Sequence, residues 1–416
     1  MEALRYGREI RWLYQAALTI FLVTIGLGMA RGIGLITFEN RNQLLTHLHS
    51  GAIGWITLGI MASVLWLYGG TEARRGDERW VSWMSILLIV AVPVYVIAWW
   101  TGNLPFRATA GTFVLVGIVV YVVWLVREAA SIGYGNLTTP QLGAVVGLVA
   151  LVIGSTLGVL LQVGFATNTN IVPGEAVGAH AETQVSAYLV LLAMSFAYWR
   201  LHGNDRTARG TWMVWLFLAG GAVNAVSLLA NVPPATILFI PLDITAFVLL
   251  FSLVWRQLLA PGWFVADSAR HYAIAVPFGL VFLVIFIVLI GGLVSGVWKE
   301  FTDIPPNLIP ASEHPLFVGM VTMTLFGLLF DLNRSRRSIW PWADHVIFWG
   351  ISVAVAAFTL AILFNATDTF KFITPVLGLS ILLGIMAHTM RLWSAPTGTP
   401  VAQSSRPASA PGERST

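Results

Sequence analysis

Twelve long apolar stretches constrain this chain more than any other feature. A helix needs about 20 apolar residues to cross the hydrocarbon core of a bilayer, and each stretch is long enough to do so. The chain is 57% hydrophobic and only 10% charged, which excludes a water-soluble globular domain. The sequence therefore predicts an all-α integral membrane protein with twelve transmembrane helices. These lie roughly at 12–35, 44–68, 80–100, 106–126, 140–164, 177–199, 211–231, 235–255, 272–297, 314–332, 342–364 and 371–393.

The distribution of Lys and Arg predicts the orientation in the membrane, because cytoplasmic loops carry an excess of positive charge. With a cytoplasmic N-terminus, 18 of the 23 Lys and Arg residues fall on the cytoplasmic side. The other five, on the outer side, are Arg31, Arg41, Arg107, Lys299 and Lys371. We therefore expect a bacterial or archaeal inner (plasma) membrane protein with both termini in the cytoplasm. The net charge of +4 follows from this topology, so the expected partner is the lipid bilayer and not nucleic acid.

Three of the stretches are similar to one another. "HSGAIGWITLGIMASVLWLYGG" begins at His49, "HAETQVSAYLVLLAMSFAYWRLHG" at His180 and "HPLFVGMVTMTLFGLLFDLNRS" at His314. Each is the fourth predicted helix after the one before it, which predicts three four-helix repeats at about 1–131, 132–268 and 269–394. Together they would form one membrane domain, followed by a tail, 395–416, that is rich in Pro, Ser and Ala and is predicted to be disordered.

Four histidines are expected at one depth near the outer surface. His47, His49, His180 and His314 fall in the first turns of the stretches 44–68, 177–199 and 314–332, which all enter the membrane from outside. A single intramembrane histidine is usually a hydrogen-bonded packing residue. Ionisable groups in a bilayer are costly, however, and four at one level predict a ligand site. The remaining histidines, at or near cytoplasmic helix ends, are expected to be interfacial; they are His202, His271, His345 and His388.

The ligand chemistry follows from the residue types. The chain has no cysteine, which excludes iron–sulfur clusters, thiolate copper and c-type haem attachment. Successive residues of an α-helix turn by about 100°, so His47 and His49 point about 200° apart. Either they serve two different sites, or one serves a site and the other does not. A b-type haem held by two histidines needs no cysteine. We therefore expect at least one haem b, held by His314 with either His47 or His49. It remains open whether His180 joins the other histidine of this pair at a second haem or metal.

Glycines follow the histidines in two of these stretches. Gly54 and Gly319 would leave space for a porphyrin, or would let neighbouring helices approach closely. The sequence alone does not separate these two functions.

"HLHSGAIGW" resembles the His-x-His stretch of the haem-copper oxidase catalytic subunits (subunit I), particularly the cbb-type oxidases and the nitric oxide reductases. That superfamily has twelve helices in three four-helix arcs, with ligands on the second, sixth and tenth helices. In the oxidases the His-x-His pair lies on the tenth helix and a single histidine on the second, whereas here the pair is on the second. The resemblance implies a haem-binding protein, with a quinol or a cytochrome c as electron donor and a diatomic gas as ligand.

The chain departs from that family at the copper site. The family has a His-His pair at its seventh helix, but the stretch 211–231 has no histidine. Gln184 stands four residues after His180, where the oxidases have a tyrosine. A complete copper site is therefore not expected, and the pattern is similar to short, divergent relatives such as the NnrS group, which is implicated in the nitric oxide response.

Several functions remain open at this point. The preferred one is electron transfer, or the binding or detoxification of a diatomic gas such as nitric oxide; any enzyme would be a haem-dependent oxidoreductase. The alternatives are a non-catalytic haem scaffold or sensor and a twelve-helix proton-coupled transporter, for which the predicted intramembrane acids Glu182 and Asp243 are suited. If haem is bound, Arg41, Arg107 and Lys371 are at the right level to neutralise its propionates.

Overall fold

The computed structural model describes residues 4–38, 40–69, 77–298, 303–305, 307–336, 338 and 340–394. Its helices are α1 (Gly7–Gly32), α2 (Arg41–His49), η1 (Ser50–Thr57), α3 (Leu58–Tyr68), α4 (Asp77–Thr101), α5 (Leu104–Ile132), η2 (Tyr134–Asn136), α6 (Thr139–Thr167), α7 (Ala176–Glu182), η3 (Thr183–Val190), α8 (Leu191–Leu201), α9 (Ala208–Leu229), η4 (Pro233–Leu238), α10 (Phe239–Leu259), α11 (Ala269–Val294), α12 (Leu308–His314), η6 (Pro315–Thr322), α13 (Met323–Leu332), α14 (Ala343–Leu363), η7 (Thr367–Thr369) and α15 (Phe370–Trp393). The predicted tail, 395–416, and Lys299 lie outside the described residues.

The prediction of an all-α integral membrane protein is confirmed. Eleven helical spans in the described part of the chain are long and apolar enough to cross a bilayer. The predicted span at 177–199 is also helical, over α7, η3 and α8, but polar residues near its start make it less apolar than the others. Three spans are each built from three consecutive helical segments: α2–η1–α3, α7–η3–α8 and α12–η6–α13. We call them the second, sixth and tenth spans.

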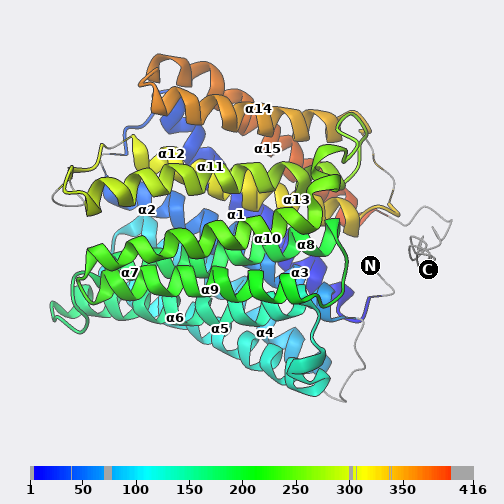
Figure 1. Ribbon diagram of the computed structural model, residues 1–416, viewed down its shortest axis with the longest axis horizontal. Coiled ribbons are helices and arrows are strands. Elements are labelled where there is room, and N and C mark those ends of the chain that lie inside the picture. The colour runs from blue at the N-terminus through cyan, green and yellow to red at the C-terminus, as the bar shows by residue number, and fades with distance from the viewer. Residues whose placement is uncertain are drawn as a thin grey trace, which may run out of the picture.

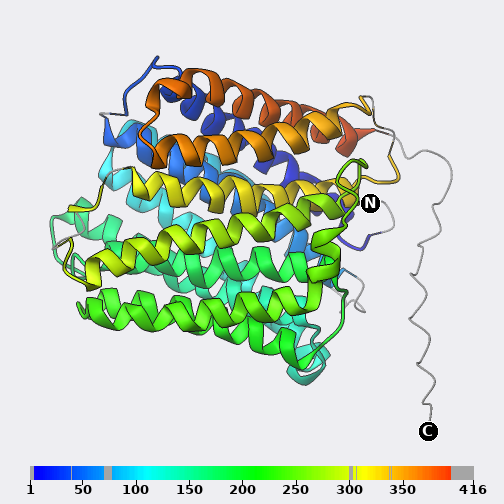
Figure 2. The ribbon, with the colours of Figure 1, turned by 45° about the horizontal axis from the view of Figure 1, so that its top comes forward.

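The helices run side by side along one axis of the molecule (Figures 1 and 2). The second, sixth and tenth spans all begin at the left-hand end of Figure 1, where α2, α7 and α12 are labelled. We call this end the histidine end. Helix α1 begins, and α15 ends, at the opposite end, which we call the terminal end.

Burial distinguishes the second and tenth spans from the rest. In their most apolar windows 83% and 78% of the residues are buried, against 33–61% in the other spans that are apolar enough to cross a bilayer. The sixth span is similar, because every residue from Ser186 to Tyr198 is buried. Other helices pack around them, with α4 against α5, α5 against α6, α9 against α10 and α15 against α1. The three spans that carry the predicted ligands are therefore in the interior of the bundle.

Two buried hydrogen bonds join these three spans. The indole Nε1 of Trp55 donates to the Thr322 hydroxyl at 2.9 Å, which links the second span to the tenth. The Tyr188 hydroxyl donates to Thr57 Oγ1 at 3.1 Å, which links the sixth span to the second. Both rings are essentially inaccessible to solvent, so these donors need internal partners.

Local sequence sets several helix ends. The Asn103 side chain accepts a hydrogen bond from Phe106 N at the start of α5. Thr138 and Gln141 form a capping box at the start of α6, and Pro140 occupies its first turn. Helix α6 ends at Thr167, and the next residue, Asn168, has the left-handed φ of 52° that asparagine tolerates better than most residues.

Candidate functional site

A π-helical segment follows the histidines in each of the three central spans. η1, η3 and η6 each have eight residues, which is unusual because π-helix is rare and is most often found at functional sites. Their first residues are Ser50, Thr183 and Pro315. They are therefore 133 and 132 positions apart (183 − 50 and 315 − 183). The three segments thus occupy corresponding places in the chain.

Threonine hydroxyls form the junctions at the ends of two of these segments. Thr57 and Thr322, the last residues of η1 and η6, each donate to the carbonyl oxygen five residues earlier, at 2.8 Å. The same hydroxyls accept the hydrogen bonds from Tyr188 and Trp55 described above. The end of a π-segment is thus also where neighbouring spans are joined.

The π-segments define a register for the histidines that differs from the predicted one. His47 and His180 lie three residues before the first π-helical residue of their spans, whereas His49 and His314 lie one residue before it. The sequence alignment had placed His180 opposite His49. In the register of the structure His180 corresponds to His47, and Glu182 takes the place of His49 and His314.

All four histidines are held in the same way at their Nδ1 atoms. Nδ1 of His47 bonds to Thr24 O at 2.9 Å, that of His49 to Leu45 O at 2.7 Å, that of His180 to Gly154 O at 2.7 Å, and that of His314 to Pro310 O at 2.8 Å. A carbonyl oxygen can only accept, so each Nδ1 carries the proton. Each neutral imidazole therefore presents its Nε2 lone pair, which is the arrangement of a metal-binding histidine with a backbone partner.

The four carbonyl partners fall into two kinds. His47 and His180 bond across to α1 and α6, respectively, and a glycine one turn further along that helix leaves room for the ring. A methyl group added at Gly28 would lie 3.0 Å from His47 Cε1, and one at Gly158 would lie 2.7 Å from His180 Cε1. His49 and His314 instead bond to the carbonyl four residues earlier in their own helices. All four histidines are only partly exposed.

The four imidazoles lie within electrostatic range of one another in two pairs. A charge on His314 would repel one on His47, and a charge on His180 would repel one on His49. His47 bonds to α1 and His49 stacks on Trp99 of α4, so the two rings have different neighbours, as expected from the turn between them. In the described part of the chain no three His, Asp or Glu side chains converge closely enough to hold one metal ion. The arrangement therefore offers pairs of ligands.

Aromatic rings and an arginine surround these histidines. The ring of His49 stacks on Trp99 with centroids 4.0 Å apart, and the Arg107 guanidinium lies 4.4 Å from the centroid of the same indole. Arg107 is in the first turn of α5 and is 7% exposed. His314 packs against Phe358, with ring centroids 4.5 Å apart. The apolar rings limit the access of water, while Arg107 places a positive charge near His49.

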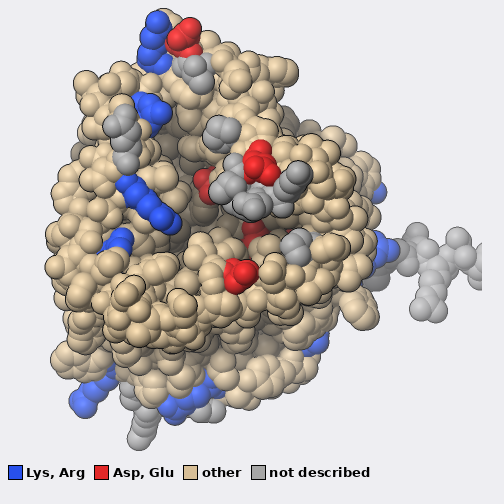
Figure 3. All heavy atoms as spheres, turned by 90° about the vertical axis from the view of Figure 1, so that its left-hand side faces the viewer, with Lys and Arg blue, Asp and Glu red and all other residues tan. Residues whose placement is uncertain are grey.

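Acidic side chains also lie at the histidine end. Glu182 accepts hydrogen bonds from Asn224 Nδ2 at 2.8 Å and from Ser186 Oγ at 3.2 Å. Glu313, which the sequence analysis did not single out, is close enough to Glu182 to repel it. Figure 3 looks onto the histidine end and shows a hollow with acidic side chains on its walls. Asp243 is further inside, only 2% exposed, and its Oδ1 has no hydrogen-bond partner among the described residues.

Gly54 and Gly319 lie against side chains of neighbouring helices and not against the histidine rings. A methyl group on Gly54 would collide with Ile20, and one on Gly319 with the ring of Phe278. Both glycines therefore allow close packing between helices. The glycines that contact the histidine rings are Gly28 and Gly158, on neighbouring spans, and sequence spacing alone gave no signal for them.

The other four histidines are not all interfacial. His271 and His388 are each 2% exposed and are packed among phenylalanine rings, so the prediction is wrong for these two. His202 is exposed and lies 3.7 Å from Asp205. His345 accepts a hydrogen bond from Arg270 at 3.2 Å. None of the four joins the two pairs described above.

No protein-family model matches this chain, and no curated protein matches it.

Proposed function

We propose that this integral membrane protein binds haem b at the histidine end, with the imidazoles of His47 and His314 as axial ligands. The two Nδ1–H···O bonds support this, because they fix the tautomer in which both Nε2 atoms are free to bind iron. A macrocycle supplies four nitrogen ligands of its own, so two imidazoles complete the coordination of its iron. A site of two histidines from facing spans fits this ligand better than it fits a bare metal ion.

The second pair, His49 and His180, is proposed as the site of a second haem or metal. Its rings are held in the same tautomer, and Arg107 is near His49. A haem carries two propionates, and a desolvated guanidinium is a strong partner for a carboxylate. Arg107, whose Nε has no hydrogen-bond partner among the described residues, therefore fits the predicted function of neutralising a propionate. Arg41 lies close enough to Arg107 to add its charge.

The finer architecture that we propose is that of haem-copper oxidase subunit I, with three four-helix arcs and both termini in the cytoplasm. The equal spacing of the π-segments and the central position of the three histidine-bearing spans support it. A bound haem would supply reversible one-electron chemistry. Because two imidazoles fill the coordination of its iron, a diatomic gas would bind only after one of them is released. We propose electron transfer, or nitric oxide binding or detoxification, as the function, because the stretch 211–231 offers no histidine for a copper site.

The direct test is a reduced-minus-oxidised spectrum and a pyridine haemochrome assay on the full chain, purified in detergent after haem-replete expression. We expect a b-type spectrum with one or two haems per chain. His314→Ala should remove or greatly weaken the low-spin signal. His202→Ala is the matched control, because His202 is exposed and distant in sequence from the site; the buried His388 is a poor control, since its loss would also disturb packing.

A well-folded protein without a Soret band would contradict haem binding. Equal loss of signal from His314→Ala and His202→Ala would show that the ligands lie elsewhere. If only the His47–His314 pair binds haem, His180→Ala should leave the haem content unchanged while removing whatever occupies the second pair.

The buried acids favour one other function, a proton-coupled carrier. A row of polar side chains leads from the hollow towards the interior. Glu182 bonds to Asn224 on α9. Asp243 packs against Gly220, which lies one helical turn from Asn224 on the same helix. Buried intramembrane acids are typical of proton relays. Proton uptake into proteoliposomes that depends on a solute gradient and is lost in Asp243→Asn, in a protein without haem, would support the carrier instead.

A further inference from the structure

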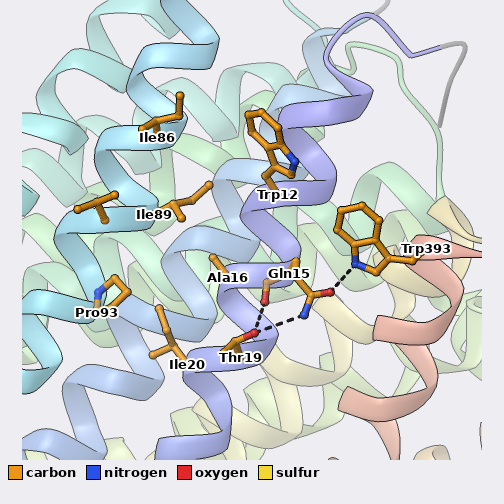
Figure 4. A pocket seen from close by; sticks show the side chains of 10 residues that line it. Trp12, Gln15, Ala16, Thr19, Ile20, Ile86, Ile89, Pro93 and Trp393 are labelled. Carbon is orange, nitrogen blue, oxygen red and sulfur yellow. Dashed lines mark hydrogen bonds between the residues drawn. The ribbon is translucent and has the colours of Figure 1, made fainter.

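A lipid-facing groove lies away from the histidines, between α1, α4 and α15. It has a volume of about 410 Å³ and is lined mostly by apolar side chains. Figure 4 shows Trp12 on α1 and Trp393 on α15, with Ile86, Ile89 and Pro93 in a row along α4. Its polar atoms are already paired, because Trp393 Nε1 donates to Gln15 Oε1 at 2.9 Å and Gln15 Nε2 donates to Thr19 Oγ1 at 3.3 Å. Since all three helices are membrane spans, hydrocarbon is the expected filling of this groove.

Positive charge stands at the end of the groove nearest the start of α1. Arg8 and Arg11 lie one turn before Trp12 and Gln15 on the same face of α1. The Arg8 guanidinium lies 4.9 Å from the centroid of the Trp12 ring, and that of Arg11 lies 5.2 Å from that of Trp393. The two cations thus rest on the aromatic walls of the groove.

One of these two charges is uncompensated. Arg8 is paired with Glu9 at 2.7 Å. Arg11 forms no ion pair with any residue that the structure describes, and its Nε has no hydrogen-bond partner among them. The end of the groove where Arg8 and Arg11 lie therefore has one positive charge in excess. This charge beside an apolar groove is complementary to a lipid with an anionic head group.

We propose that this groove binds an anionic phospholipid, with one acyl chain between α1 and α4 and the phosphate beside Arg11 and Arg8. The site is independent of haem binding. One arginine near a phosphate favours an anionic over a zwitterionic lipid by about fivefold. The groove itself contributes equally to both lipids, because an acyl chain is the same in each.

The test is native mass spectrometry of the detergent-purified full chain, titrated with phosphatidylglycerol and with phosphatidylcholine of identical acyl chains. The wild type should retain phosphatidylglycerol about fivefold more tightly. Arg11→Gln should abolish this preference, and Arg256→Gln should not; Arg256 also lies over a tryptophan, its neighbour Trp255, but does not border this groove.

The groove is tested separately by filling it. Val90→Trp should weaken the retention of both lipids, because Val90 lines the groove and its added bulk would occupy the acyl-chain channel. Val248→Trp on α10 is the matched control, since Val90 and Val248 are both 59% exposed. Equal retention of the two lipids by the wild type, or an unchanged retention in Val90→Trp, would overturn the proposal. A dimer that Val90→Trp dissociates would show that a second copy of the chain occupies the groove.

Discussion

The hydrogen bond between Trp55 and Thr322 provides a quantitative test of how the central spans are held together. Thr322→Val keeps the shape of the side chain but removes the acceptor of the buried indole N–H. It also removes the hydroxyl that donates to Phe317 O. Leaving a buried donor unsatisfied costs about 1–3 kcal/mol, so we expect Thr322→Val to lower the free energy of unfolding by about that amount.

A double-mutant cycle isolates the bond between the two spans. In the Trp55→Phe background no indole N–H remains to be left unpaired, so Thr322→Val should cost less there. Interhelical hydrogen bonds in membrane proteins have coupling energies that average about 0.6 kcal/mol and reach about 1.7 kcal/mol. We expect a coupling in this range, because both partners are at most 1% exposed and the bond is 2.9 Å long.

The assay is reversible unfolding of the four proteins in mixed detergent micelles, followed by circular dichroism. Thr324→Val serves as the matched control. Thr324 is also buried, and its hydroxyl donates at 2.8 Å to a carbonyl of its own helix, but no indole bonds to it. A coupling near zero for Trp55 with Thr322, or one equal to that for Trp55 with Thr324, would refute the view that this bond joins the second and tenth spans.

Two further substitutions test other parts of the structure. Gly158→Ala should cost about 1–3 kcal/mol of stability through overpacking and should displace the His180 ring, because the new methyl group would lie 2.7 Å from its Cε1. Gly26→Ala, where an added methyl group contacts nothing within 4 Å, is the control, and equal unfolding midpoints for the two would contradict the prediction. Asp344→Asn should cost about 3–5 kcal/mol, since it leaves the guanidinium of Arg391 buried without the opposite charge that pairs with it at 2.7 Å. The double variant Asp344→Leu with Arg391→Met should recover most of that loss in a chemical unfolding experiment, and a double variant less stable than Asp344→Asn would refute the explanation.

The positions of the membrane spans could be predicted from the sequence because they depend on the summed apolarity of about 20 consecutive residues, which can be read directly from the chain. The stretch 44–68 was predicted and α2–η1–α3 occupies Arg41–Tyr68; the stretch 371–393 corresponds to α15, Phe370–Trp393. The largest differences are of six residues: α5 ends at Ile132 rather than at 126, and the tenth span begins at Leu308 rather than at His314. Asn307, Pro310 and Glu313 lowered the apolarity there, but helix formation within a protein interior does not require every residue to be apolar.

The π-segments could not have been predicted in this way. An α-helix and a π-helix of the same residues bury nearly the same apolar surface and differ in which carbonyl each N–H reaches. Matching histidine with histidine in the sequence aligned His180 with His49. Only the position of the π-segments in the structure shows that His180 corresponds to His47. The pairing of rings and their tautomers likewise depend on contacts with carbonyls of neighbouring spans, such as Thr24 O and Gly154 O.

The register explains why three central spans provide two pairs of histidines. Relative to the start of each π-segment, the second span has a histidine at both positions, three residues before and one residue before. The sixth span has His180 at the first position and Glu182 at the second. The tenth span has Ser312 at the first and His314 at the second.

Each of the two pairs then combines a first-position histidine of one span with a second-position histidine of another central span. His47 of the second span is within electrostatic range of His314 of the tenth, and His180 of the sixth is within electrostatic range of His49 of the second. Around a ring of three parallel spans the same rule leaves one combination, Ser312 of the tenth span with Glu182 of the sixth. Neither residue has an imidazole, and Glu182 bonds instead to Asn224. The acidic hollow thus has a hydrogen-bonded carboxylate, Glu182, at the position where the second and tenth spans have His49 and His314.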